Sequence, residues 1–282
     1  MGQGIALNLA RKGWRLTVLD HPGNQPLDEL RGLGVDLAET ATDLAAQVQV
    51  LLLCVTGSLQ VESVLLGSQG ALAALRPGAV VIDCSTSIPA STQAVAQAVQ
   101  AAGGRFLDAP MTRTPKEARE GRLNLLVGGD AQLLHECLPL LQCFAENITH
   151  VGPAGSGHRM KLLHNYVSLG SVALLAEAAA CALDAGMQPQ VFVDVLAQGG
   201  GAGVALDRLA PYLLEGDPSA LRFAMANAFK DMGYYGTMAQ DGQAARGIAQ
   251  AVYDSYAIGV AKGGGQALVP ELVALLRTGR KK

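Results

Sequence analysis

Six short strand-like runs alternate with helix-like segments in the first half of the chain, and this alternation constrains the fold more than any other feature. The runs lie at residues 15–19, 48–55, 79–85, 105–110, 123–129 and 148–151. The run VQVLLLCV is apolar throughout most of its length, as in strands covered on both faces. Strands that alternate with helices predict an α/β, Rossmann-type, doubly wound parallel sheet, which binds ligands outside the carboxyl ends of its strands.

The start of the chain is unusual for such a fold. Residues 1–13 have the pattern of the helix that follows a dinucleotide-binding turn, but no strand precedes them. Gly2 takes the place of the last fingerprint glycine, and Asp20 ends the next strand, where an acidic residue binds the ribose. We therefore expect the natural chain to begin before Met1, because an empty central position would leave backbone groups unpaired at roughly 1 to 3 kcal/mol each.

After residue 152 the strand patterns stop and helical patterns take over. They lie at residues 189–196, 220–241, 246–262 and 270–277, after a long apolar pattern that reaches Gly186. This division predicts an NAD-binding domain at 1–152, its first strand missing, and an all-α substrate and oligomerisation domain at 153–282. The long helix should be buried on most sides, and the broad apolar face at 248–260 predicts a homodimer or homotetramer.

Composition excludes several classes of function. Half of the residues are apolar and 16% are charged, with a net charge of −3, so we expect neither nucleic acid nor a membrane surface as a partner. The five cysteines lack paired or metal-like spacing, which predicts a reducing, cytoplasmic location. We expect no membrane span, since the apolar run at 170–183 is short and contains Glu177, and no metal, since no cluster has ligand spacing.

The stretch GPAGSGHRMKLLHN at residues 152–165 carries the candidate chemistry. Lys161 and Asn165 are four residues apart, which places an ammonium and a carboxamide on one helical face. One interpretation is that Lys161 extends to solvent from the first turns of the helix. The other is an acid/base lysine, with Asn165 holding the substrate.

Four motifs together carry a resemblance. They are Met1-Gly2, DAPMTRTPKEAREGRLNLLVGG at 108–129, GSGHRMKLLHN at 155–165 and FKDM at 229–232. With them the chain resembles, over essentially its whole length, the β-hydroxyacid dehydrogenase family, which includes 3-hydroxyisobutyrate dehydrogenase, tartronate semialdehyde reductase and sulfolactaldehyde reductase. The resemblance to the sulfolactaldehyde branch is the strongest. It implies hydride transfer between a nicotinamide and a small anionic 3-hydroxy acid or its semialdehyde, in a cleft between two domains.

The resemblance also implies roles for individual residues. Lys161 would donate the proton in aldehyde reduction and accept it in alcohol oxidation, while Asn165 would hydrogen-bond the substrate. Lys230 would lie close to both substrate and cofactor. The positions that match dinucleotide contacts are Met1, Gly2, Asp20, Val55, Thr56 and Thr86.

Physical chemistry adds two expectations. A free lysine has a pKa of ~10.4, so acid/base work at neutral pH requires desolvation or neighbouring cations, for which Arg113 and Lys230 are candidates. Asp20 would repel a 2′-phosphate, and His21 rather than an arginine follows it, so NAD is favoured over NADP. The alternative for Asp20 is a solvated strand end.

The most informative departure from the family is the loop Thr112-Arg113-Thr114. Much of the family carries Ser-Gly-Gly there, where the substrate carboxylate binds. Arg113 adds a forked cation suited to a more strongly charged group such as a sulfonate, unless it turns to solvent or pairs with Glu117 or Glu120. His164 also replaces the usual asparagine beside Asn165, which leaves one substrate contact open.

Several functions therefore stay open. Within the enzyme class, the substrate is a sulfonate or a carboxylate such as tartronate semialdehyde or 3-hydroxyisobutyrate. The rival from another class is a dinucleotide-binding protein without catalysis. Lys161, Asn165 and Lys230 together argue against that rival, and the lysine also argues against an imine-reducing relative, which would be expected to lack it.

Overall fold

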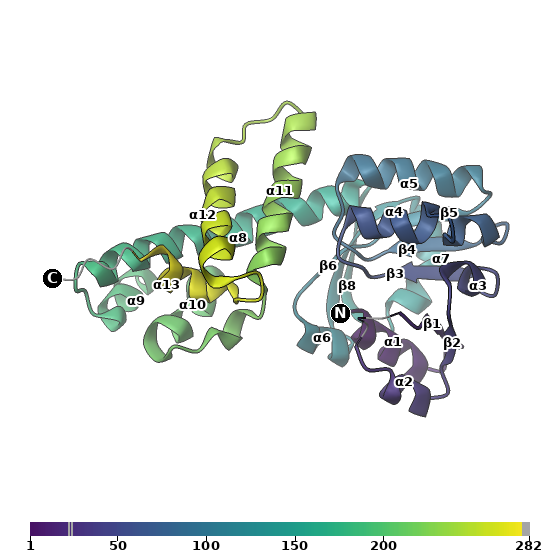
Figure 1. Ribbon diagram of the computed structural model, residues 1–282, viewed down its shortest axis with the longest axis horizontal. Coiled ribbons are helices and arrows are strands. Elements are labelled where there is room, and N and C mark those ends of the chain that lie inside the picture. Colours follow the sequence, from purple (N-terminus) through teal and green to yellow (C-terminus); the bar gives the residue numbers. More distant parts are fainter. Residues whose placement is uncertain (22, 24, 278–282) are drawn as a thin grey trace. The chain divides into compact units, whose positions relative to one another are not determined.

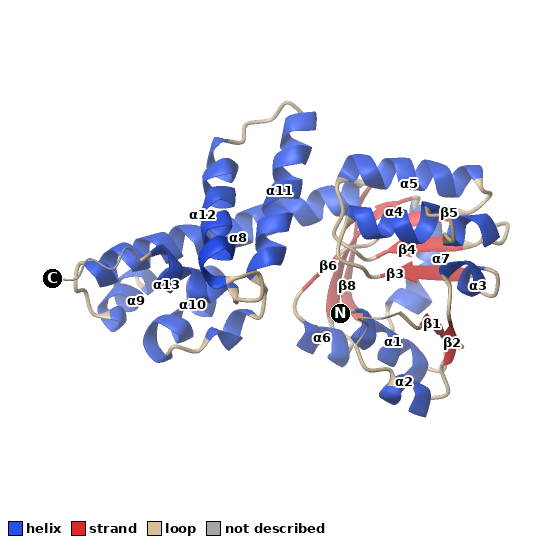
Figure 2. Ribbon diagram, in the orientation of Figure 1, coloured by secondary structure: helices blue, strands red, loops and turns tan. Residues whose placement is uncertain are grey.

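The computed structural model describes residues 1–21, 23 and 25–277. The chain divides into two compact units, Met1–Lys161 and Leu162–Lys282. The first is α/β and the second is helical, as the colouring by secondary structure in Figure 2 shows.

The main sheet of the first unit has six strands. They are β3 (Val50–Leu53), β4 (Val80–Asp83), β5 (Arg105–Asp108), β6 (Met111–Thr112), β7 (Leu123–Gly129) and β8 (Ala145–Gly152). The order is β3-β4-β5-β7-β6, with β8 paired to β7. This sheet, together with the helical second unit, confirms the predicted fold class.

One part of the sheet is antiparallel, although a parallel sheet was predicted. β3, β4 and β5 are parallel, and so are β7 and β8, but β7 runs antiparallel to both β5 and β6. A parallel partner needs a crossover of a dozen or more residues, usually a helix. The link from β5 to β7 contains only β6 and the six-residue helix α6 (Pro115–Glu120), so the chain turns back instead.

Helices cover both faces of this sheet (Figure 1). Val80 and Ile82 of β4 pack with residues of α1 (Gly2–Arg11) and α7 (Ala131–Leu141). Val81, between them in sequence, packs on the other face with α4 (Ser58–Leu66) and α5 (Pro89–Ala101). Because successive side chains of a strand point to opposite faces, a strand buried on both sides is apolar along most of its length.

The remaining strands stand apart from the main sheet. β1 (Thr17–Leu19) pairs in parallel with β2 (Asp36–Ala38) to form a two-stranded sheet. A largely apolar cavity of about 1020 Å³ is lined by residues of both β1 and β3. In the described part of the chain, no strand pairs with β1 and β3 at once. The short helices α2 (Asp28–Gly32) and α3 (Ala41–Ala45) and the 3-10 turn η1 (Ala71–Ala74) complete this unit.

The second unit packs around the long helix α8 (Ser156–Asp184), which contains the boundary between the units. Its other elements are α9 (Pro189–Ala197), α10 (Val204–Glu215), η2 (Pro218–Leu221), α11 (Met225–Asp241), α12 (Gly247–Gly263), η3 (Val269–Glu271) and α13 (Leu272–Leu276). Val172, Ala176 and the fully buried Tyr256 belong to its apolar core. Tyr256 donates its hydroxyl proton to the carbonyl of Leu169, at 2.8 Å.

Two expectations about α8 are corrected. It was expected to be buried on most sides, yet Val167 and Leu174 are 67% and 71% exposed on one of its faces. The apolar run at 170–183 was also expected to be too short for a membrane span, but it belongs to a helix of 29 residues that is long and apolar enough by length and composition. Its contribution of Val172 and Ala176 to the core is the behaviour of a core helix in a globular unit.

Candidate functional site

The first turn of α1 and the carboxyl ends of β3 and β4 meet in the first unit. A Cβ on Gly2 would lie in ordinary contact with the Cβ of Cys54, at 3.4 Å, so α1 begins close to the end of β3. The amide of Val55 donates to the hydroxyl oxygen of Ser85 at 3.0 Å, which ties the end of β3 to the end of β4. The predicted cofactor residues Gly2 and Val55 therefore share one edge of the sheet.

This edge has the donors that a dinucleotide requires. Met1 precedes α1 without a side-chain capping bond, so the helix offers its first-turn backbone amides and positive end to a pyrophosphate. Ser87, one residue after the predicted contact Thr86, has a buried hydroxyl that no described atom hydrogen-bonds. A buried polar group without a protein partner is what a site for a polar ligand leaves open. These residues fit an NAD(P) cofactor.

Asp20 follows β1 and forms an exposed ion pair with Arg31 of α2, with Nη2 and Oδ2 3.4 Å apart. The sequence reasoning considered only the residue directly after Asp20 and missed this arginine, which lies eleven positions further on. The ribose-binding candidate thus has a cation beside it, which bears on the choice between NAD and NADP.

The cysteines nearest to this edge are neutral thiols. Burial, as the largest cause, raises the pKa of Cys54, and it raises the pKa of Cys84 well above the usual value. Because the thiolate is the nucleophilic form, neither side chain is an activated nucleophile. All five cysteines of the chain lack disulfide partners.

All three residues of the loop at 112–114 have partners within the first unit. The hydroxyl oxygen of buried Thr112 accepts a hydrogen bond from the side-chain amide of Asn124, at 3.1 Å. Thr114 is the N-cap of α6 and forms a capping box with Glu117, whose pKa is lowered chiefly by the hydrogen bond from the Thr114 hydroxyl. The Thr114 hydroxyl predicted to bind substrate is therefore used to begin a helix.

Arg113 has a left-handed backbone, with φ of 78°, at the position where the family carries glycine. Its guanidinium donates to the carboxylate of Glu146 on β8 and to the carbonyl of Arg122. The hydrogen bond from Arg113 is the largest cause of the lowered pKa of Glu146. The two partners that the sequence suggested, Glu117 and Glu120, are thus replaced by Glu146. An anion-binding role would require Arg113 to leave this carboxylate.

The start of α8 is fixed against the end of β5 and the middle of β7. Asp108, at the end of β5, accepts the backbone amides of Gly155 and His158, each at 2.8 Å. A Cβ on Gly157 would lie 2.4 Å from the carbonyl oxygen of Leu126, far inside contact distance, so only glycine permits this approach. The glycines of the GSGHRMK motif therefore let α8 begin on the sheet, one turn before Lys161, whose exposure is 9%.

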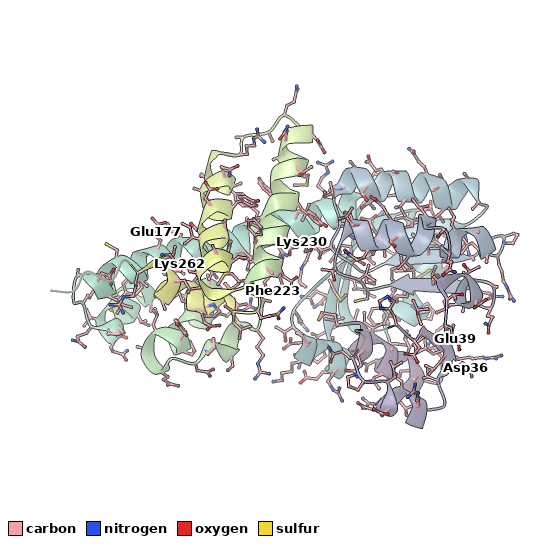
Figure 3. All side chains as sticks on the ribbon, viewed as in Figure 1. Asp36, Glu39, Glu177, Phe223, Lys230 and Lys262 are labelled. Atoms are coloured by element: carbon pink, nitrogen blue, oxygen red, sulfur yellow. The ribbon has the colours of Figure 1, made fainter. Side chains whose placement is uncertain are left out.

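A polar cluster in the second unit surrounds the amide of Asn165. Its Nδ2 donates to Oδ2 of the buried Asp231 at 2.7 Å, and its Oδ1 lies 3.1 Å from Nδ1 of His164. Lys230, labelled on α11 in Figure 3, forms an ion pair with Oδ1 of Asp231 at 2.8 Å. Its ammonium also lies 4.7 Å from the ring centroid of Tyr234, within cation–π range.

Asp231 is the residue that sequence reasoning missed in this cluster. It stands inside the FKDM motif, but only Lys230 was given a role. In the structure Oδ2 of Asp231 accepts a hydrogen bond that orients Asn165, and Oδ1 forms the ion pair with Lys230. His164, left open as a donor or a cofactor contact, faces the Asn165 side-chain oxygen. Among the described residues, no group of three or more histidines, cysteines or carboxylates is arranged to hold a metal.

Comparison with known proteins extends over both units. Residues 1–152 match the NAD-binding domain of 6-phosphogluconate dehydrogenase, and residues 155–276 match the NAD-binding family of NADP-dependent 3-hydroxyisobutyrate dehydrogenase. The chain is 31% identical to an NAD-dependent L-serine dehydrogenase of Pseudomonas aeruginosa, over 78% of this chain and 74% of that protein. It is 34% identical to a 2-hydroxy-3-oxopropionate reductase of Escherichia coli, over 67% and 64%.

A solved structure agrees with these matches. The 3-hydroxyisobutyrate dehydrogenase of Mycobacterium tuberculosis, solved with L-serine, superposes with a TM-score of 0.86 at 25% identity. The match covers 99% of this chain and 96% of that one.

Proposed function

Because this chain belongs to the β-hydroxyacid dehydrogenase family of NAD(P)-binding oxidoreductases that act on CH–OH groups, we propose that it transfers a hydride between NAD and a small anionic 3-hydroxy acid or its semialdehyde. The observation that carries the proposal is α8. Its first turn is fixed on the sheet by Asp108, and it presents Lys161 and Asn165 one helical turn apart.

Each residue has a defined task in this reaction. The nicotinamide, when bound, takes or gives the hydride. Lys161 removes the hydroxyl proton during oxidation and returns it to the alkoxide during reduction. Asn165, its amide oriented by Asp231 and His164, hydrogen-bonds the substrate, and Lys230 attracts its anionic group.

The preference for NAD rests on Asp20. Its carboxylate suits the two ribose hydroxyls and repels a 2′-phosphate. Arg31 weakens that repulsion by pairing with Asp20, so the discrimination should be moderate. L-Serine dehydrogenase of Pseudomonas aeruginosa, a relative of this chain, is NAD-dependent.

Two substrate classes have separate support. The loop Thr112-Arg113-Thr114 favours a sulfonate such as sulfolactaldehyde, through its resemblance to sulfolactaldehyde reductase and the donors of Arg113. The hydrogen bonds of Arg113 to Glu146 and Arg122 favour a carboxylate, as in 3-hydroxyisobutyrate or 2-hydroxy-3-oxopropionate, because they occupy that cation.

The proposed function also includes a cellular location and an oligomeric state for the enzyme. We propose a cytoplasmic homodimer or homotetramer without nucleic-acid or membrane partners and without a metal. The exposed Val167 and Leu174 of α8, with Ile248 of α12, offer apolar surface for a second copy. Much of the apolar face predicted at 248–260 is used within the unit itself, since Val252 and Tyr256 are buried there. Light scattering coupled to size-exclusion chromatography measures the assembly directly.

The test is the rate of NAD reduction with a panel of alcohols. The panel holds 2,3-dihydroxypropane-1-sulfonate, glycerate, 3-hydroxyisobutyrate and L-serine, each with NAD and with NADP. We expect turnover of at least one anionic substrate, with a higher kcat/KM for NAD. NADH binding without turnover of any of them would instead support a dinucleotide-binding protein without catalysis.

A further inference from the structure

A buried histidine joins the ends of two strands to the first turn of α8. His158 is 0% exposed, and its Nδ1 lies 2.8 Å from the hydroxyl oxygen of Thr92 on α5. Its Nε2 lies 3.2 Å from the carbonyl oxygen of Ser85, just after β4. Because a carbonyl only accepts hydrogen bonds, Nε2 must carry a proton. Nothing in the proposed hydride transfer uses this side chain directly.

Two carboxylates flank the ring. Oδ2 of Asp83 is 3.8 Å from Nε2, and Oδ2 of Asp108 is 3.8 Å from Nδ1. Both aspartates are fully buried, and both accept backbone amides: Asp83 from Ser85, and Asp108 from Gly155 and His158. In the described part of the chain, no lysine or arginine forms an ion pair with either carboxylate. A carboxylate buried this deeply without a counter-charge is unfavourable, because it has lost its hydration.

The protonation state of Nδ1 decides whether the ring carries a positive charge that balances the two carboxylates. The Thr92 hydroxyl has one proton and lies 3.1 Å from the carbonyl of Ile88, the N-cap residue of α5. If Thr92 donates to Ile88, the contact with Nδ1 is a hydrogen bond only when Nδ1 is protonated too. A neutral ring would need Thr92 to turn its proton toward Nδ1, and it would leave both carboxylates without a counter-charge.

We propose that His158 is a buried imidazolium between Asp83 and Asp108, and that this charged cluster positions the first turn of α8, and with it Lys161, against the ends of β4 and β5. The same cluster contacts the sheet edge that holds Gly2 and Val55, because the hydroxyl oxygen of Ser85 accepts a hydrogen bond from the amide of Val55. His158 is therefore a positioning residue. Its effect on turnover rests on the function proposed above, whereas its charge does not.

The first experiment counts ring protons in the intact wild-type protein. NMR of protein labelled with 15N in its histidines should show, at pH 7.5, one ring with two slowly exchanging N–H groups. Thr92→Val, which removes the partner of Nδ1, should shift the signals of that ring and thereby assign them to His158. A single ring N–H for His158 would overturn the proposal. This measurement needs no substrate and no turnover.

The second experiment tests positioning. In His158→Gln, we expect amide exchange at Gly155 and residue 158 to accelerate at least tenfold, while the amides of β7 and β8 stay protected. We also expect kcat to fall about tenfold or more, with the Kd of NADH changed less than threefold. His135→Gln, on the exposed face of α7, is the matched control and should change neither.

The outcomes separate the two proposals. Unchanged exchange and kcat in His158→Gln would remove the positioning role. If His158→Gln does not fold, the same amide-exchange and kcat measurements are made on Thr92→Val. If wild type turns over no substrate in the panel, the proposed function fails, while the proton count and the exchange rates still decide the state and role of His158.

Discussion

The two sides of the first unit differ in how completely their strands are paired. β4 has a strand on each side, and all four of its residues are buried. β1 has one partner, and all three of its residues are partly exposed. The side with β4, the paired side, also holds the network of Asp83, Asp108 and His158. The side with β1, the open side, has a cavity and the exposed pair of Asp20 and Arg31. Under the proposed function, the paired side would position Lys161 as the acid/base, and the open side would set the choice between NAD and NADP.

The largest effect should come from Lys161, which the paired side positions. Lys161→Ala should lower kcat by about 100-fold or more, because it removes the proton donor and acceptor. The Kd of NADH should stay nearly unchanged, since the cofactor edge is intact. Lys116→Ala, at an exposed position of α6, is the matched control and should keep full turnover. Equal kcat in the two variants would remove Lys161 from the mechanism.

A methyl group at Gly157 should break the packing of the paired side. The Cβ would lie 2.4 Å from the backbone oxygen of Leu126, which cannot move without disturbing β7. Gly157→Ala should therefore lower the free energy of unfolding by about 2 to 3 kcal/mol. Gly200→Ala, where a Cβ meets nothing within 4 Å, should change it by less than about 0.5 kcal/mol. Similar denaturation midpoints for the two variants would contradict the close approach.

Adding a strand should make the open side resemble the paired one. A designed segment of about five valines and isoleucines, joined to Met1 by a short glycine turn, would offer its backbone to the edges of β1 and β3 and its side chains to the cavity. Each buried side chain gains about 1.5 to 3 kcal/mol before the cost of ordering the chain, so we expect a net gain of about 2 kcal/mol. A Gly/Ser segment of the same length is the control. Equal stability of the two fusions would show that the cavity does not accept a strand.

Cofactor choice should respond to the open side. Asp20→Ser removes the carboxylate that repels a 2′-phosphate and releases Arg31 to attract one. The ratio of kcat/KM for NADP to that for NAD should rise about tenfold, equivalent to ~1.4 kcal/mol. Adding Arg31→Ala should cancel most of the rise. An unchanged ratio in Asp20→Ser would place the adenosine ribose elsewhere.

The features that the sequence predicted are those that depend on hydrophobic periodicity and motifs within continuous stretches of the chain. The alternation of strand-like runs with helical segments, and the helical patterns after residue 152, predicted the fold class, which the structure confirms. Four motifs in order predicted the family, which matches over both units confirm. Each of these patterns and motifs lies within one continuous stretch of sequence. Recognising them did not require knowledge of which distant segments meet.

The features that sequence missed are contacts between distant positions. Arg113 and Glu146 are 33 residues apart, and Asn165 and Asp231 are 66 apart. The reversal at β7 likewise depends on which strand the chain meets after β6. Side chains of the same type were available nearby, as Glu117 and Glu120 were for Arg113, so composition and spacing alone did not select the partner.

The smallest effect should be that of Arg113→Gly, which compares the two substrate classes. Glycine adopts a φ of 78° without strain, which restores about 1 to 2 kcal/mol, while the exposed ion pair with Glu146 contributes little. The melting temperature should therefore change by less than about 4 °C. If Arg113 leaves Glu146 to bind a sulfonate, the same variant should lower kcat/KM for 2,3-dihydroxypropane-1-sulfonate about tenfold and leave glycerate unaffected. If sulfonate turnover is unaltered, Arg113 is confined to its bond with Glu146, and the anion pocket must be sought among the other residues assigned to the substrate.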